Sequence, residues 1–283
     1  MKESVLHFAC EGEPLVGILA APADAVAEVG VVIIVGGPQY RAGSHRQFTL
    51  LARQLADEGC AALRFDYRGM GDSAGEARDF LAVEADIAAA IDALLAARPA
   101  LKRVVLFGLC DAASAALLYL DARPDPRVAG LVLLNPWVRS AATLAQTHVK
   151  HYYWQRLRQP EFWRKLLGGG VGLGALRALA GNLRLARQVG RPQAGTRSFQ
   201  QRMAATAQSF AGPLLLLISE DDLTACEFID HARTSAPWQA ALARPAARRV
   251  DLPGADHTLS ARRHLDQAHS AIVQWLQQLP APR

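Results

Sequence analysis

Cys110 lies where an expected strand passes directly into an expected helix. The run Val104–Phe107 is apolar, as in a buried strand, and the Ala/Leu-rich run Ala112–Leu118 is typical of a buried helix. Such a turn crowds the backbone, and small residues two positions before and after its centre, here Gly108 and Ala112, relieve the crowding. The pattern is that of a nucleophile elbow, G-x-S-x-G, with Cys replacing Ser and Ala replacing the last Gly. The alternative interpretation is a small, buried, inert cysteine.

Two further groups of the right chemistry follow expected strands later in the chain. Asp221 and Asp222 come after the run Pro213–Ser219, and His257 comes after Arg248–Leu252. The order nucleophile, acid, histidine is the one that accompanies a strand–elbow–helix nucleophile. Because sites in open parallel sheets form outside the carboxyl ends of the strands, we expect these side chains to meet at one edge.

These residue types predict nucleophilic catalysis by a thiolate. The histidine would take the thiol proton, return a proton to the leaving group and then activate water, while the carboxylate holds its tautomer. The oxyanion needs backbone donors, and we expect one from Asp111 N–H. The second would come from the loop Gly36–Tyr40, where Pro38 has no N–H, which leaves Gly37 or Gln39, with Gln39 preferred. The Asp111 carboxylate would oppose thiolate formation unless it points away.

The surrounding pattern alternates strand-like and helix-like runs, which predicts an α/β fold with a mostly parallel sheet. Strand-like runs are Val5–Phe8, Leu15–Ala20, Gly30–Val35, Cys60–Phe65, Lys102–Phe107, Val128–Leu134, Pro213–Ser219 and Arg248–Leu252. Helix-like runs include Arg46–Glu58, Arg78–Ala97 and Arg262–Gln278.

The alternation stops between Val138 and Phe210, a stretch of expected helix and loop. It holds twelve Lys and Arg residues and a single acid, Glu161. Three interpretations compete for this basic segment. It could face an anionic substrate or carrier, it could dock on a membrane surface through the Gly/Leu-rich stretch Leu166–Ala180, or it could bind nucleic acid. We expect no nucleic-acid partner, because no binding fold accompanies the charge.

Composition limits the class of protein. The chain has 283 residues, 51% of them hydrophobic and 20% charged, with a net charge of +5, which is typical of a globular protein. The four cysteines are widely spaced, so we expect free thiols, no metal and a reducing, cytoplasmic setting. The beginning of the sequence has no apolar stretch typical of a signal peptide.

The chain resembles the α/β-hydrolase superfamily over nearly its whole length, and Asp66–Ser73 is similar to the D-x-R-G-x-G-x-S turn of that superfamily. More narrowly, the chain resembles the exosortase A system-associated hydrolase 1 family. The stretches that carry this resemblance are Gly36–Arg41 with Gly43–Phe48, Gly108–Ala112 and Asp222–Ala225. Dienelactone hydrolase is a more distant relative that also has Cys at the elbow.

The resemblance implies a fold and a site. The fold is a mostly parallel eight-stranded sheet with helices on both faces, with residues 1–137 and 211–283 as the core and 138–210 as a basic helical cap. The site is a triad of Cys110 as nucleophile, His257 as base and Asp222, rather than Asp221, as the acid. No cofactor is implied.

The resulting hypothesis is a hydrolase of carboxylic esters or thioesters that works through an acyl-cysteine intermediate on a small-molecule acyl substrate, anionic or carrier-bound. A related alternative is an acyltransferase in which a saccharide hydroxyl replaces water. The alternative from another class is a non-catalytic binding protein on the same fold, which would have no need of Cys110, Asp222 and His257 together. The sequence leaves the acyl group, the leaving group and the oligomeric state open.

Overall fold

The computed structural model describes residues 1–23, 28–37, 39–139 and 197–280. The chain divides into two compact units, one of Met1–Val138 with Phe199–Arg283 and the other of Arg139–Ser198. Nearly all of the second unit lies outside the described residues, and so does most of the predicted cap; of its basic residues, Arg139, Arg197 and Arg202 are described. The first unit contains every candidate catalytic residue.

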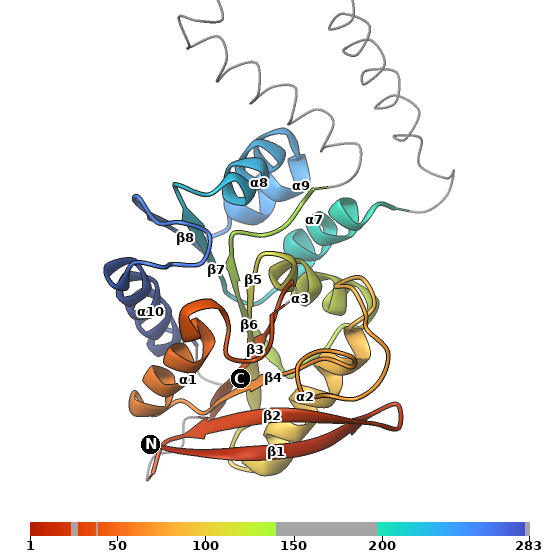
Figure 1. Ribbon diagram of the computed structural model, residues 1–283. Coiled ribbons are helices and arrows are strands. Elements are labelled where there is room, and N and C mark those ends of the chain that lie inside the picture. The colour runs from red at the N-terminus through yellow and green to blue at the C-terminus, as the bar shows by residue number, and fades with distance from the viewer. Residues whose placement is uncertain (24–27, 38, 140–196, 281–283) are drawn as a thin grey trace, which may run out of the picture. The chain divides into compact units, whose positions relative to one another are not determined.

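The first unit is built on a sheet with the strand order β1-β2-β4-β3-β5-β6-β7-β8 (Figure 1). The strands are β1 Lys2–Cys10, β2 Glu13–Ala21, β3 Val29–Ile34, β4 Ala62–Phe65, β5 Arg103–Leu109, β6 Val128–Leu134, β7 Leu214–Ser219 and β8 Ala247–Leu252. The hairpin β1–β2 is antiparallel and β2 pairs with β4 antiparallel, while all pairs from β4 to β8 are parallel. The predicted eight-stranded, mostly parallel sheet is confirmed.

Helices cover both faces of this sheet. They are α1 Gln47–Asp57, α2 Glu84–Ala97, α3 Asp111–Ala122, α7 Phe199–Ser209, α8 Leu223–Thr234, α9 Ala236–Leu242 and α10 Arg262–Gln277, and a short 3-10 helix, Ser44–Arg46, precedes α1. Helices α1 and α10 pack on one face, and α2, α3 and α7 on the other. Apolar side chains on both faces of the central strands explain why these strands read as uninterrupted hydrophobic runs.

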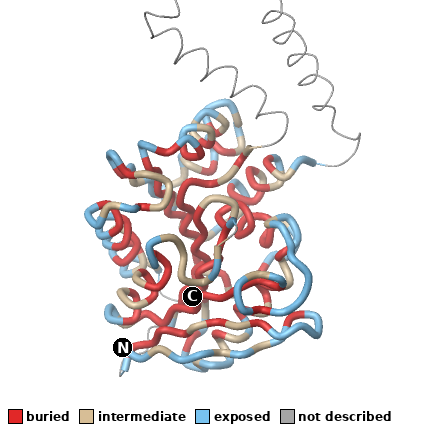
Figure 2. The backbone as a smooth tube through the Cα atoms, in the orientation of Figure 1, coloured by how far each residue is buried: buried red, intermediate tan, exposed pale blue. Residues whose placement is uncertain are grey.

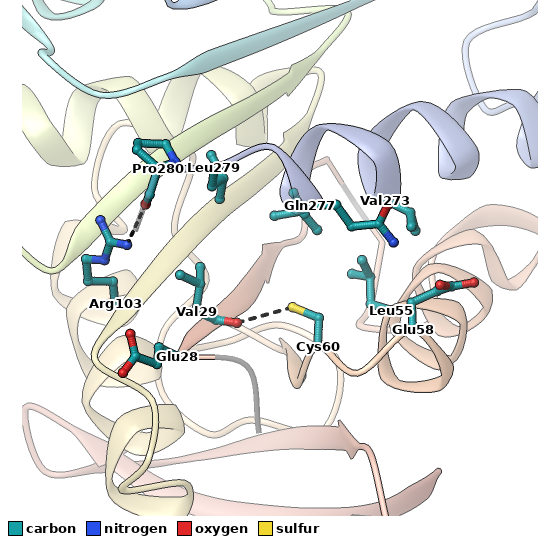
Figure 3. A pocket seen from close by; sticks show the side chains of 11 residues that line it. Glu28, Val29, Leu55, Glu58, Cys60, Arg103, Val273, Gln277, Leu279 and Pro280 are labelled. Carbon is teal, nitrogen blue, oxygen red and sulfur yellow. Dashed lines mark hydrogen bonds between the residues drawn. The ribbon is translucent and has the colours of Figure 1, made fainter. Parts of the chain in front are cut away.

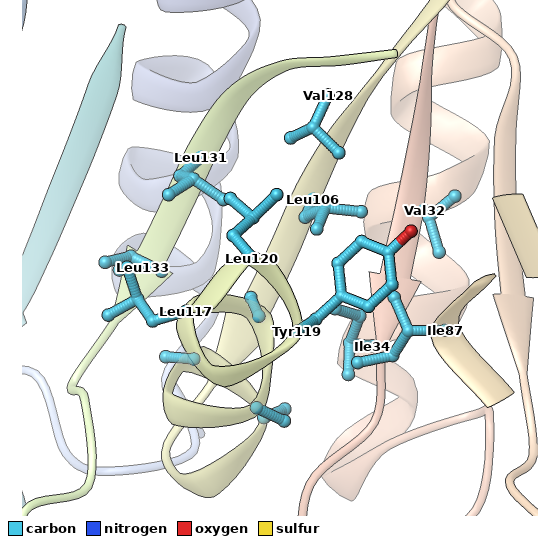
Figure 4. Close-up of a cluster of buried hydrophobic side chains, with 14 of the residues drawn as sticks. Val32, Ile34, Ile87, Leu106, Leu117, Tyr119, Leu120, Val128, Leu131 and Leu133 are labelled. Atoms are coloured by element: carbon cyan, nitrogen blue, oxygen red, sulfur yellow. The ribbon is translucent and has the colours of Figure 1, made fainter. Parts of the chain in front are cut away.

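The core consists of one hydrophobic cluster on each face of the sheet. In β3, Val32 and Ile34 belong to the cluster under α2 and α3, while Val31 and Ile33 belong to the cluster under α1 and α10. Figure 4 shows the first cluster, in which Tyr119 and other side chains of α3 lie against β5 and β6. In Figure 2 the buried residues follow the central strands. The strands whose ends carry the candidate site are therefore packed in the core.

One predicted helix boundary is wrong. The helix expected over Arg78–Ala97 begins only at Glu84, and the chain forms a turn before it, in which the Leu81 N–H donates to the Asp79 carboxylate at 2.9 Å and the Ala82 N–H donates to the Asp79 carbonyl at 3.1 Å. Helix α7 packs on α3 and belongs to the first unit, whereas the prediction assigns its residues to the cap. Gln200 also donates to the Val138 carbonyl at 3.2 Å, which ties the two ends of the first unit together there.

Candidate active site

Cys110 sits at a strained turn between β5 and α3. Its φ of 62° and ψ of −123° are unusual for a residue with a side chain, as expected at a nucleophile elbow. A Cβ added at Gly108 would come within 2.4 Å of the Ala112 backbone, so that flank has no room for a side chain. The Cys110 N–H donates to the Leu134 carbonyl at 2.9 Å and its carbonyl accepts the Trp137 N–H at 3.1 Å. These bonds hold the strained turn in place at the carboxyl end of β5.

The structure brings together Asp222 and His257 from the ends of two neighbouring strands. Asp222 Oδ2 lies 2.8 Å from His257 Nδ1. The Asp222 carboxylate also caps α8, with Oδ1 accepting the Thr224 N–H at 3.0 Å and Oδ2 accepting the Ala225 N–H at 3.3 Å. Asp221 is exposed and its backbone N–H donates to the Ala255 carbonyl. Of the two adjacent carboxylates, Asp222 is therefore the one that orients the imidazole.

The surroundings of His257 favour its charged form. Its interaction with the Asp222 carboxylate, followed by its interaction with the Cys110 sulfur, raises the pKa of His257 to about 10, although partial burial opposes the change. An imidazolium next to a cysteine sulfur would stabilise the thiolate, which is the form that attacks a carbonyl carbon. The three predicted side chains thus lie in one cluster.

The Asp111 carboxylate points away from the thiol and into the loop that follows β3. Its Oδ2 accepts the Gly37 N–H at 3.0 Å. A Cβ added at Gly36 would lie 2.1 Å from Asp111 Oδ1, so this contact requires glycine at position 36. Burial raises the pKa of Asp111, while hydrogen bonds from backbone N–H groups, that of Gly37 first, oppose the change. Because the Asp111 carboxylate is turned towards this loop, it is directed away from the Cys110 thiol, which removes the expected repulsion between the two groups.

This hydrogen bond bears on the two candidate oxyanion donors of the loop. The Gly37 N–H already donates to Asp111, which leaves Gln39 N–H as the better candidate. The Gln39 side chain turns the other way, and its Oε1 accepts the Ser44 N–H at 3.0 Å. Asp111 N–H belongs to the first turn of α3, where backbone N–H groups have no intrahelical partner.

Arg41 and Asp66, which the sequence analysis did not place in the site, anchor the same loop. The Arg41 backbone N–H donates to Asp66 Oδ1 at 2.6 Å, and its guanidinium contacts the Asp66 and Asp72 carboxylates. Asp66 is fully buried and also accepts the Asp72 N–H at 3.0 Å. Its place in the turn Asp66–Ser73 was the available signal, but sequence alone does not identify Arg41 as its partner.

A pocket lies at the opposite end of the strands, separate from the candidate site (Figure 3). Val29 and Arg103, the first residues of β3 and β5, line it together with Cys60 and the end of α10. Cys60 Sγ donates to the Val29 carbonyl at 3.3 Å, and burial raises the pKa of Cys60 to about 12. A thiol this weakly acidic is no nucleophile at neutral pH.

Neither a metal centre nor a membrane span is evident in the part of the chain that the structure describes. No three or more His, Cys, Asp or Glu side chains there gather in a way that could hold a metal ion. None of the described helices is both long and apolar enough to cross a membrane.

The strand order, the elbow after β5 and the order of nucleophile, acid and histidine define the class of α/β-hydrolases. Residues 31–274 match the model of the alpha/beta hydrolase family. The chain therefore belongs to that family and is a hydrolase by class. No curated protein matches the sequence.

Solved structures with the same fold align with almost the whole of this chain and over almost the whole of their own length. The esterase Pf2001 of Pyrococcus furiosus is 16% identical, with a TM-score of 0.65 over 99% of this chain and 94% of its own. The esterase domain of a Rhodothermus marinus protein is 20% identical, with a TM-score of 0.61 over 98% of this chain and 99% of its own. The alpha/beta hydrolase GrgF from Penicillium sp. sh18 is 16% identical, with a TM-score of 0.65 over 99% of both chains. At these identities the likeness establishes the fold.

Proposed function

We propose that the protein cleaves a carboxylic ester or thioester through an acyl intermediate on Cys110. The observation that carries this proposal is the contact of His257 Nδ1 with Asp222 Oδ2 at 2.8 Å. The Cys110 sulfur also interacts with His257 and contributes to its raised pKa. A nucleophile, a base and an orienting carboxylate in contact are the elements of an acyl-transfer site. Two of the structural neighbours described above are esterases, which agrees with this chemistry.

The first half of the reaction acylates Cys110. The thiolate attacks the carbonyl carbon and forms a C–S bond, and the negative charge that develops on the carbonyl oxygen meets the N–H groups of Asp111 and Gln39. Collapse of this tetrahedral species breaks the bond to the leaving group, which takes the proton from His257. The enzyme is left as a thioester with neutral His257.

The second half releases the acyl group. Neutral His257 removes a proton from water, the hydroxide attacks the thioester carbonyl, and collapse breaks the C–S bond. The products are the carboxylic acid, the Cys110 thiolate and the His257 imidazolium, which restores the starting charges. The carboxylate of Asp222 keeps Nδ1 protonated, so that Nε2 exchanges the protons.

The test is acyl trapping on the intact protein. With p-nitrophenyl acetate, we expect p-nitrophenol release together with a single acetyl adduct of Cys110, measured by intact mass and peptide mapping. Cys110→Ala should remove the adduct and the turnover, and His257→Ala should remove the turnover. Cys226→Ala is the matched control, because Cys226 is an exposed free thiol and its loss should leave both signals in place. Wild-type protein with neither turnover nor a Cys110 adduct would contradict the proposal.

A further inference from the structure

A cavity of about 410 Å³ lies beside the elbow. Gly36, Gly37 and Asp111, which flank Cys110, form one wall, and Tyr67, Met70 and Phe80 contribute to the rest. The volume falls within the roughly 300–1,000 Å³ of small-molecule pockets. The cavity therefore has the position and the size to hold part of a substrate whose carbonyl group reaches Cys110.

The strand order indicates which part of the substrate the cavity would hold. The cavity is formed at the ends of β3, β4 and β5, whereas Asp222 and His257 follow β7 and β8. In the sheet, β3 and β4 lie on one side of β5 and β7 and β8 on the other, so the cavity extends to the side of Cys110 opposite His257. The leaving group must lie on the His257 side, because His257 gives it a proton. The acyl group then extends towards the cavity.

The lining of the cavity favours an uncharged acyl group. Tyr67 is 5% exposed, Met70 is half-buried, and the Phe80 ring packs edge-on against Phe199 with ring centroids 5.4 Å apart. These side chains present mostly apolar surface. A carboxylate placed there would lose its hydration without gaining a partner and would face the Asp111 carboxylate.

Three charged residues line the cavity, Arg78, Asp79 and Asp111. Arg78 and Asp79 are both exposed and carry opposite charges. Deeper in the wall, Tyr67 Oη and Asp111 Oδ1 are buried without a hydrogen-bond partner among the described residues. Burial, followed by the Asp111 charge, raises the pKa of Tyr67, so the phenol keeps its proton. The one cation among the described lining residues, Arg78, is thus exposed, and the buried part of the wall offers none to an anionic acyl end.

We infer that this cavity is the acyl subsite and that it takes an uncharged, mainly apolar acyl chain longer than acetyl. The inference rests on the proposed function, which it extends from a reaction class to a substrate class. A negatively charged carrier remains compatible with it, because a carrier would be part of the leaving group on the other side of Cys110.

The test compares three esters: p-nitrophenyl acetate, p-nitrophenyl hexanoate and mono-p-nitrophenyl adipate. Hexanoyl and adipoyl chains have equal carbon counts and differ in the terminal carboxylate. Wild-type kcat/KM should be higher for hexanoate than for acetate and at least about tenfold lower for adipate than for hexanoate. Met70→Trp should fill the cavity and lower the hexanoate-to-acetate ratio at least about tenfold. Phe80→Ala should enlarge the cavity and raise kcat/KM for p-nitrophenyl octanoate, added as a fourth ester for this variant, relative to hexanoate.

Leu81→Trp is the control, since Leu81 is 40% exposed, neighbours Phe80 and does not line the cavity. It should leave the hexanoate-to-acetate ratio at the wild-type value. The subsite alone would be overturned by an active enzyme in which Met70→Trp leaves the hexanoate-to-acetate ratio unchanged and Phe80→Ala leaves the octanoate-to-hexanoate ratio unchanged. A preference for adipate over hexanoate would also overturn it. Wild-type protein that forms no acyl-Cys110 with any of the three esters would overturn the proposed function and the subsite together.

Discussion

The Asp111 carboxylate accepts the backbone N–H of Gly37 at 3.0 Å and so joins the residue after the nucleophile to the loop after β3. Asp111 is the first residue of α3, and Gly37, with a φ of 62°, lies in the loop that also contains Gln39. The two proposed oxyanion donors, Asp111 N–H and Gln39 N–H, are therefore held by one hydrogen bond between their segments. This contact makes the Asp111 side chain a positioning group for the site.

Removal of this carboxylate should slow acylation. Asp111→Ala loses the acceptor for Gly37 N–H and frees the loop, so we expect the acylation rate to fall about tenfold to a hundredfold, below the roughly 10²–10³ typical of losing an oxyanion donor outright. Asp111→Asn retains an oxygen that accepts the same N–H and should stay within a few fold of wild type. Stopped-flow p-nitrophenol release, with thermal midpoints measured in parallel, checks both variants. Equal rates for Ala and Asn would show that the side chain does not position the loop.

The two neighbouring carboxylates at the end of β7 should behave differently. Asp222→Asn cannot stabilise the imidazolium or fix its tautomer, so kcat should fall at least about a hundredfold, within the loss of up to about 10⁴ known for such a change. Asp221→Asn alters an exposed side chain and should change kcat by less than about twofold. Steady-state kinetics on one ester decide this. A larger loss for Asp221→Asn would move the acid role to that residue.

The position of the candidate residues at strand ends could be predicted from the sequence, because each of them follows a strand-like run. The runs before Cys110, Asp222 and His257 correspond to β5, β7 and β8, and parallel topology then brings their ends to one edge. The direction of the Asp111 side chain could not be predicted from the sequence, because it depends on a contact with Gly37, 74 positions away.

The boundaries that were missed also depend on contacts between distant parts of the chain. Helix α7 lies within the stretch where the sequence predicts helix and loop but no core, and its packing on α3 is not visible in local periodicity. A turn at Asp79 precedes α2, with the Leu81 N–H donating to the Asp79 carboxylate. Local propensity alone extends that helix over Arg78–Val83, where Arg78, Asp79 and Phe80 instead line the cavity beside the elbow.

His257 should make the stability of the protein depend on pH. Its pKa is about 10 in the folded protein against about 6.5 in an unfolded chain. A group whose pKa is raised by folding stabilises the folded state fully below its unfolded pKa, and this contribution is lost as the pH rises through the folded pKa. The contribution of the His257 pair with Asp222 should therefore be constant below about pH 6.5 and should decline up to about pH 10. Thermal unfolding of wild type and His257→Gln between pH 5.5 and 10.5 measures it as the difference between two midpoints. That difference should shrink over this window as the pH rises, and a difference that grew would mean that His257 is neutral in the folded protein. His269→Gln is the matched control between pH 7.5 and 10.5, because burial lowers the pKa of His269 to about 4, so that this residue is neutral there in both the folded and the unfolded chain.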